Sequence, residues 1–192
     1  MDTSETNNRP LAPQEWFHLG PFTVFDLETT GMSSLHDRIV EIAAVRIETN
    51  GTLSRFHSLI NPGIRIPSGA SAVHGISNAM VAQSPSFNEI AYTFLKFAEE
   101  STLVAHNARF DLGFLQESLH RNGLKIWEGK TMDSIILIKK AYPGLPSYSL
   151  QFLRREFGLG DGTGQAHRAN ADVEWTLEIF AMSMKILINA CK

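Results

Sequence analysis

Two acidic residues at the end of an apolar run are the first group in this sequence that could do chemistry. Asp26 and Glu28 follow the run from Pro21 to Phe25, which reads as a buried strand. Because side chains two positions apart on a strand point to the same face, the two carboxylates are expected side by side. Adjacent carboxylates repel each other unless a positive charge lies between them, and a divalent cation is the usual one. Such pairs are also common on protein surfaces, so this one needs support from the rest of the chain.

A second acidic site ends the segment from His106 to Asp111. This segment lies where a short apolar strand is followed by a predicted helix, and ligands bind at such strand ends in sheets that alternate with helices. The helix dipole also favours an acidic residue in a first helical turn, so Asp111 alone would be explained without a function. Asn107 is similarly open, because it can cap the helix or fix the turn.

A third acidic site opens the last predicted helix. His167 and Asp172 follow a glycine-rich stretch at 160–164. A histidine in a glycine-flanked segment, five positions before a carboxylate on a helix, can swing over a site that the carboxylate anchors. A capping arrangement with a solvated His167 explains the same residues about as well.

The four carboxylates thus lie at three separate places, each where a predicted element meets a turn. Asp26, Glu28, Asp111 and Asp172, together with one histidine, match the needs of two-metal phosphodiester hydrolysis. In that chemistry two Mg²⁺ ions about 4 Å apart stabilise the attacking and leaving oxygens, and a base takes a proton from the attacking water. Histidine has a suitable pKa for this base, and oxygen-only ligands favour Mg²⁺ or Mn²⁺ over zinc.

The composition excludes several other classes of protein. The chain has 192 residues, 43% of them hydrophobic and 19% charged. It has no apolar run near the ~20 residues needed to cross a bilayer, so we expect one soluble globular domain without membrane contact. A formal net charge of −3 argues against a protein that wraps nucleic acid with a broadly basic surface, although bound divalent ions would supply positive charge beside a phosphate. The single cysteine, Cys191, excludes a disulfide within the chain and fits a cytoplasmic location.

The start of the sequence differs in composition from the rest. Residues 1–15 are polar, contain Pro10 and Pro13, and lack the basic start and apolar middle of a secretory signal. We therefore predict a disordered leader over residues 1–20 and a single domain over residues 21–192. Trp16 and Phe17 are expected to pack the end of the leader onto this domain.

Hydrophobic patterns predict the elements that must position the acidic residues. After the first strand, runs rich in β-branched residues predict strands at 38–47 and 52–60, and Asn50-Gly51 between them is a strong hairpin signal. A loop rich in Gly, Ser and Pro is predicted from 61 to 85. Further strands are predicted at 102–106 and within 125–132, and helices at 86–98, 108–122, 134–141, 149–157 and about 169–187. A three-strand meander followed by alternating strands and helices indicates an α/β domain with a mixed sheet flanked by helices.

The acidic segments resemble the three sequence motifs of the DEDD superfamily of 3′→5′ exonucleases, in the DEDDh subgroup, whose third motif contains a histidine. The resemblance runs from Phe22 to about Ile188. It is strongest to the proofreading epsilon subunit of bacterial DNA polymerase III and to the exonuclease segment of Gram-positive replicative polymerases. Further matching segments are Ile39-Val40-Glu41-Ile42, Val73-His74-Gly75-Ile76, Met132-Asp133-Ser134, Tyr142-Pro143-Gly144 and Ser149-Leu150. The family implies a ribonuclease H-like fold with a five-stranded mixed sheet.

The resemblance also implies roles for the five residues of the proposed site. Asp26 would bridge two Mg²⁺ or Mn²⁺ ions, while Glu28 and Asp172 would complete the site of the metal that holds the attacking water. Asp111 would support the second metal, partly through water. His167 would be the general base.

Other residues are expected, on the same resemblance, to touch the end of a strand. They are Thr29, Val73, His74, Asn107 and Phe110. Glu28 and the backbone near Thr29 would meet the terminal 3′-hydroxyl. A turn-forming role is an equal alternative for His74, and a place in the core is an equal alternative to base stacking for Phe110. Glu41 lies in a buried strand pattern and is expected to support the site rather than to bind metal.

The predicted function is a metal-dependent 3′→5′ exonuclease that releases nucleoside 5′-monophosphates from single-stranded 3′ ends, in proofreading or repair. DNA is the favoured substrate. Two alternatives stay open: an RNA-trimming enzyme like ribonuclease T or oligoribonuclease, and a non-catalytic subunit that binds 3′ ends. A DNA polymerase subunit is the candidate protein partner.

Overall fold

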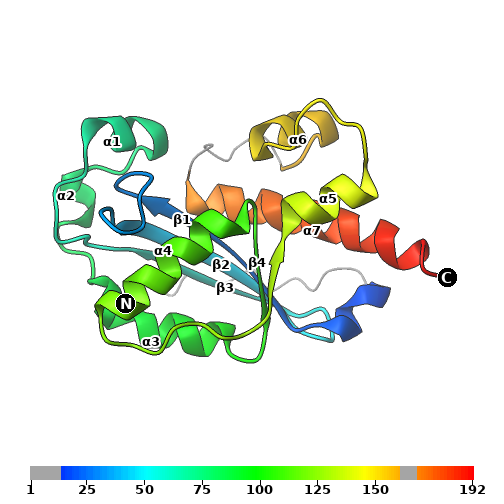
Figure 1. Ribbon diagram of the computed structural model, residues 1–192, viewed down its shortest axis with the longest axis horizontal. Helices are drawn as coiled ribbons and strands as arrows, with labels where there is room; N and C mark the ends of the chain where they lie inside the picture. Colours follow the sequence, from blue (N-terminus) through cyan, green and yellow to red (C-terminus); the bar gives the residue numbers. More distant parts are fainter. Residues whose placement is uncertain (1–13, 161–167) are drawn as a thin grey trace.

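The structure, a computed structural model, describes residues 14–160 and 168–192. Its described part contains one sheet in the order β3-β2-β1-β4-β5 (Figure 1). The strands are β1 (Phe22–Thr29), β2 (Ile39–Ile47), β3 (Leu53–Leu59), β4 (Thr102–Ala105) and β5 (Thr131–Asp133). β2 is antiparallel to both β1 and β3, whereas β4 is parallel to β1 and β5 is parallel to β4. The predicted α/β class with a mixed five-stranded sheet is therefore confirmed.

Helices cover both faces of this sheet (Figure 1). The described helices are η1 (Glu15–Leu19, a 3-10 helix), α1 (Ser68–His74), α2 (Asn78–Val81), α3 (Phe87–Ala98), α4 (Ala108–Arg121), α5 (Ser134–Ala141), α6 (Leu150–Phe157) and α7 (Ala169–Asn189). α3 and α4 contact the sheet on one face, while α7 crosses the other face and packs against α5, α6 and η1. Among the described helices, none combines the length and the apolar character needed to span a membrane.

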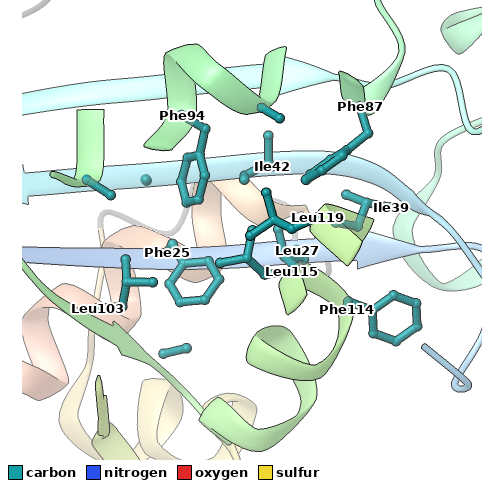
Figure 2. Close-up of a cluster of buried hydrophobic side chains, with 14 of the residues drawn as sticks. Phe25, Leu27, Ile39, Ile42, Phe87, Phe94, Leu103, Phe114, Leu115 and Leu119 are labelled. Atoms are coloured by element: carbon teal, nitrogen blue, oxygen red, sulfur yellow. The ribbon is translucent and has the colours of Figure 1, made fainter. Parts of the chain in front are cut away.

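The alternation of side chains along β1 divides the core into two layers. Phe25 and Leu27 are buried against α3 and α4, in the cluster that Figure 2 shows. Phe22 and Val24 point the other way and are buried with side chains of α7. Asp26 and Glu28 continue this second set by strand periodicity, so both carboxylates lie on the face that α7 covers.

Two element predictions need correction. The predicted loop 61–85 contains the helices α1 and α2. These helices have seven and four residues, which is too short for the helical period of apolar residues to show in the sequence. The fifth strand is also shorter than the range 125–132 suggested, because only Thr131–Asp133 pair with β4.

The predicted disordered leader extends too far into the fold. Trp16 and Phe17 are buried in η1, and Trp16 meets Phe22 and Phe180 edge to face. Burial of such aromatic area outweighs the entropy cost of ordering a short segment. The expected packing of Trp16 and Phe17 is thus confirmed, whereas the boundary at residue 21 is too late. The rest of the predicted leader, residues 1–13, lies outside the described residues.

Candidate active site

Three carboxylates converge at the carboxyl end of β1. One oxygen each from Asp26, Glu28 and Asp172 lies within 4.8 Å of the other two. Asp26 and Glu28 come from β1, and Asp172 comes from the first turn of α7, where its N–H donates to the carbonyl of Arg168 at 3.0 Å. Ligand oxygens lie about 2.0–2.6 Å from a bound Mg²⁺ or Ca²⁺, so oxygens at this separation can share one cation.

Asp111 reaches the same place because β1 is longer than its neighbour β4. The two strands pair only from Phe22 to Val24 of β1, which leaves later N–H groups on that edge open. Oδ1 of Asp111, in the first turn of α4, accepts one of them, the N–H of Leu27, at 3.1 Å. Asp111 is only 3% exposed, and its charge acts on Asp26. The structure therefore brings all four predicted carboxylates to one end of β1.

Burial and mutual repulsion raise the pKa values of these carboxyl groups. Burial, followed by the charges of Asp111 and Asp172, raises the pKa of Asp26 well above its ordinary value. Burial and then Asp172 raise the pKa of Glu28 to about 8. The pKa of Asp111 also rises to about 8, chiefly through burial and despite its hydrogen bond from Leu27. The cluster therefore favours protonation, or a cation, over four free negative charges.

Glu41 behaves differently and ties β2 to the start of α7. Its buried carboxylate accepts from Nη2 and Nε of Arg168 at 2.7 and 3.2 Å and from the N–H of Ala169 at 3.0 Å. Nε2 of His57 lies 2.9 Å from the same carboxylate. Burial alone would raise the pKa of Glu41, but the hydrogen bonds from His57, Arg168 and Ala169 lower it to about 2. Glu41 therefore stays ionised and holds the backbone, which agrees with its expected supporting role.

The predicted base, His167, lies outside the described residues. Its neighbour Arg168 is described and is fixed to Glu41, so the point at which the chain enters α7 is defined.

A groove beside the carboxylates brings together most of the residues expected to touch a strand. Its volume is about 310 Å³, and its lining includes Glu28, Thr29, Val73, His74 and Phe110. Thr29 and Glu28 come from β1, Val73 and His74 from α1, and Phe110 from α4. The short helix that sequence patterns did not reveal therefore forms one wall of the groove.

Asn107 does not line this groove but an adjoining hollow of about 290 Å³. Phe110 and Met32 line both spaces and separate them. Met32 is 83% exposed and was not among the predicted site residues. Its only sequence signal is its place after the Thr29-Thr30-Gly31 turn that ends the first strand.

His74 is a turn-forming residue on the groove wall. Its Nδ1 accepts the N–H of Ile76 at 3.0 Å, and Gly75 between them ends α1 in the left-handed region at φ 73°. The neutral ring then carries its proton on Nε2, which is buried and makes no ordinary hydrogen bond within the described residues. Burial lowers the pKa of His74, against the opposing effect of the nearby Thr29 backbone. The structure thus supports the turn role and leaves one N–H directed away from that turn.

Asn107 fixes a turn rather than capping α4 with its side chain. It has φ 66° and makes no side-chain cap bond. Asp133 does the capping instead: its two oxygens accept the N–H groups of Asn107 at 3.3 Å and Ala108 at 3.1 Å, and Oδ1 also accepts the N–H of Ile135 at 2.8 Å. One carboxylate therefore begins both α4 and α5. The signal available in the sequence was an Asp directly before an apolar helical run.

The family model RNase_T, described as "Exonuclease", matches residues 23–180 of the chain. The chain is 38% identical to a DNA polymerase III subunit epsilon of Treponema pallidum over 161 residues, 83% of this chain and 74% of that protein. It is 37% identical to a DNA polymerase III PolC-type of Caldanaerobacter subterraneus over 168 residues, 88% of this chain and 12% of that protein. A 3′-5′ exonuclease DinG of Bacillus subtilis is 38% identical over 160 residues, 83% of this chain and 17% of that protein. The chain thus spans only a small part of the two longer relatives.

Solved structures of similar shape include two with bound DNA. Exonuclease X in complex with 5′ overhanging duplex DNA superposes with a TM-score of 0.66 at 27% identity, over 89% of this chain and 93% of that chain. E. coli Exonuclease I in complex with a dT13 oligonucleotide has a TM-score of 0.77 at 20% identity, over 88% of this chain and 42% of that chain. The similarity to Exonuclease I shows a shared fold.

Proposed function

The chain belongs to the RNase T family of exonucleases, and from this premise we propose that it is a metal-dependent enzyme that shortens single-stranded DNA from its 3′ end. The observation that carries the proposal is the convergence of Asp26, Glu28 and Asp172 within 4.8 Å, with Asp111 beside them. In this proposal the products are nucleoside 5′-monophosphates, released one at a time.

The donor set fits divalent cations. All four groups offer carboxylate oxygens, which suit Mg²⁺ or Mn²⁺. Crowding raises the pKa of Glu28 and of Asp111 to about 8, so a nearby positive charge would stabilise their ionised forms. We propose that Asp26 contacts both of two ions, that Glu28 and Asp172 hold one, and that Asp111 supports the other. When bound, such ions stabilise the attacking and leaving oxygens of a phosphodiester.

The chain's own residues would orient the strand and move the proton. Glu28 and the backbone of Thr29 lie where the groove meets the carboxylates and would hold the terminal 3′-hydroxyl. Val73 of α1, which is 54% exposed, and Phe110 of α4 offer apolar surface to the last bases on either side. His167 would accept a proton from the attacking water.

DNA is the proposed substrate because of the names of the relatives. One is a DNA polymerase III subunit epsilon and another is a DNA polymerase III PolC-type, and the Exonuclease X structure contains duplex DNA with an overhang. The non-catalytic alternative is not favoured, since all four carboxylates and His167 are present in the sequence. A DNA polymerase is the corresponding proposal for a protein partner.

The direct test uses a 30-residue DNA strand labelled at its 5′ end and the same sequence closed into a circle. With Mg²⁺ the linear strand should shorten through a ladder of single nucleotides, and the circle should resist, because a free 3′-hydroxyl must reach Glu28. Cutting of the circle at a comparable rate would show an endonuclease and overturn the proposal.

A matched RNA strand separates the two enzymatic alternatives. We expect the DNA strand to be degraded with the higher kcat/KM, since the RNA 2′-hydroxyl must fit between Glu28 and the α1 wall. Preference for RNA would move the function to RNA trimming while leaving the 3′→5′ chemistry unchanged.

A further inference from the structure

A separate hollow lies at the same end of β1 but over the layer of α3 and α4. Its volume is about 210 Å³, and it is enclosed by the start of β2, the start of α3 and the end of α4. The arginines Arg38 and Arg121 line it, and we call it the arginine hollow. Arg38 is connected directly to the catalytic end of β1, because its N–H donates to Oγ1 of Thr30 at 3.0 Å and its carbonyl accepts the N–H of Thr30 at 2.8 Å.

Both guanidinium groups are held in place yet keep free donors. Nη1 of Arg38 and Nη2 of Arg121 donate to carbonyls of the loop 34–37 at 2.9–3.1 Å. Nη2 of Arg121 also pairs with Glu117 at 3.3 Å, whereas Arg38 has no carboxylate partner within the described residues. In each arginine, Nε and the other Nη make no hydrogen bond with the described part of the chain. Two fixed guanidinium groups with open N–H pairs are suited to a tetrahedral oxyanion.

The rest of the described lining of the arginine hollow mixes apolar and polar side chains and carries no acidic group. Asn61, Ser86, Asn88 and Asn122 contribute amide or hydroxyl groups, and none of the described lining residues is Asp or Glu. The N–H and hydroxyl of Ser86, at the start of α3, are not free to bind an anion in the arginine hollow, because both already donate to the carboxylate of Glu89. Burial and the charge of Arg38 both lower the pKa of Arg121, so an anion between the two arginines would relieve their repulsion. The charge of the hollow thus comes from the two arginines.

We propose that the arginine hollow binds a backbone phosphate of the nucleic acid whose 3′ end lies in the groove beside Glu28. This inference rests on the proposed function and extends it to a second contact. Asp111 and Arg121 are ten residues apart on α4, which places the arginine hollow about 15 Å along the helix from the carboxylates. The phosphate therefore belongs to a nucleotide beyond the terminal one, on the degraded strand or on a strand paired with it.

The decisive variant adds a negative charge and removes no hydrogen bond of the described structure. Asn88 is exposed at the rim, and Asn88→Asp places a carboxylate in the first turn of α3, which helices tolerate well. Thr93→Asp is the matched control, because Thr93 is exposed on the same helix but does not line the arginine hollow. Arg38→Gln is the second variant, with its melting temperature measured to detect loss of the loop contacts.

Each variant is assayed on a DNA trinucleotide and on a 15-residue single strand, and on that strand paired so that only its 3′ end is free. For the 15-residue substrates we expect Asn88→Asp and Arg38→Gln to raise KM about tenfold with kcat unchanged. Arg38→Gln should also reduce the slope of log affinity against log salt by about 0.7–0.9. Neither variant should affect the trinucleotide, and Thr93→Asp should resemble the wild type on every substrate.

The outcomes are distinguishable. An effect on the paired substrate alone would assign the phosphate to the complementary strand, and an effect on both long substrates would assign it to the degraded strand. An unchanged KM for long substrates in both variants would overturn the inference while leaving the nuclease intact. An equal loss of activity on the trinucleotide would also overturn the inference, because this loss would indicate a distorted catalytic site. A wild-type protein inactive on every strand would instead refute the proposed function.

Discussion

At the scale of single residues, neighbouring carboxylates around β1 have opposite electrostatic environments. Asp26, Glu28 and Asp111 are crowded, and their pKa values are raised. Glu41 pairs in register with Glu28 on the adjacent strand, yet hydrogen bonds from His57, Arg168 and Ala169 lower its pKa to about 2. The protein itself therefore stabilises the Glu41 carboxylate, which holds the backbone. The ionised forms of Asp26, Glu28 and Asp111 would instead be stabilised by a bound cation.

Replacing Glu41 tests this division. Glu41→Gln keeps the shape but turns an amide N–H₂ toward the donors of Arg168 and Ala169. Breaking a buried charged pair of this kind costs about 3 kcal/mol in the free energy of unfolding. Because Arg168 begins the turn that carries Asp172, affinity for Mn²⁺ should fall as well. Urea unfolding and calorimetric Mn²⁺ titration measure the two effects.

His57→Gln is the matched control for Glu41→Gln. His57 is partly exposed and supplies only one of the four contacts of Glu41, so we expect a loss below about 1 kcal/mol and normal Mn²⁺ binding. If Glu41→Gln behaved like this control, Glu41 would not position the start of α7.

The proposed base gives a kinetic prediction. His167→Ala should retain metal and strand binding and should lower kcat by about 10²- to 10⁴-fold, because only proton transfer is lost. Wild-type kcat should also decline as the pH falls through the titration of the histidine, since a protonated imidazole cannot accept the proton of water. Single-turnover rates and strand affinities measured together decide the point. A variant that loses affinity and keeps its turnover would make residue 167 a ligand or a contact.

Sequence reasoning at this scale succeeds where residues are close along the chain. Asp26 and Glu28 share a face because strand periodicity requires it. The meeting of Asp172 with them depends on how α7 lies across the sheet, and the bond between Glu41 and Arg168 joins residues 127 positions apart. No local spacing encodes either contact. Resemblance to a family supplied the first of these contacts, but no sequence signal supplied the second.

At the scale of elements, the starts of two helices depend on one side chain. The oxygens of Asp133 accept N–H groups from the beginnings of both α4 and α5. His106 forms two hydrogen bonds near the start of α5. Its Nε2 lies 2.9 Å from the carbonyl of Tyr148 and therefore donates to it. In the neutral ring Nδ1 is then an acceptor, and it accepts from the hydroxyl of Ser134 at 2.8 Å. Burial lowers the pKa of His106 and keeps it in this neutral form.

Asp133→Ala should lower the free energy of unfolding by about 2–3 kcal/mol. It removes three accepted hydrogen bonds at two helix starts, where a single lost N-cap typically costs about 1 kcal/mol. Asp133→Asn, which keeps one acceptor oxygen, should lose about half as much. Urea unfolding measures both. A loss below about 0.5 kcal/mol for the alanine variant would show that water replaces the carboxylate without cost.

Long elements could be predicted from the sequence, and short ones could not. The predicted hairpin around Asn50-Gly51 is present, and helices α3 to α7 begin within one residue of the predicted positions. Their amphipathic faces are long enough to show a period. α1 and α2 are only seven and four residues long, so the wall of the groove was missed although Val73 and His74 were expected there.

At the scale of the whole molecule, the carboxylate cluster links stability to pH and to metal. Glu28 and Asp111 have folded pKa values of about 8, above their ordinary values of 4.5 and 3.8. A raised folded pKa contributes stability that is complete at low pH and is lost as the pH rises through about 8. Metal-free protein in EDTA should therefore melt at a lower temperature at pH 8.5 than at pH 6.

Mn²⁺ should reverse this dependence, because ionised carboxylates bind the cation more strongly. A ligand at 100 times its Kd adds about 2.7 kcal/mol to stability. Asp172→Asn removes one charge from the cluster, so it should reduce both the pH effect in EDTA and the stabilisation by Mn²⁺. Equal melting temperatures at both pH values in EDTA, with no response to Mn²⁺, would contradict the link.

The position of α7 along the chain has a consequence for the timing of synthesis. The strands and α3 to α6 all precede α7, which supplies Asp172 and, together with η1, covers the Phe22 and Val24 layer. A ribosome adds about 5–20 residues per second, so roughly 1.5–6 s separate the appearance of residue 160 from that of residue 189. During that interval α7 does not yet cover its apolar face of the nascent sheet, and the set of carboxylates is incomplete. On the proposed function, the nascent chain would gain nuclease activity only after α7 has emerged.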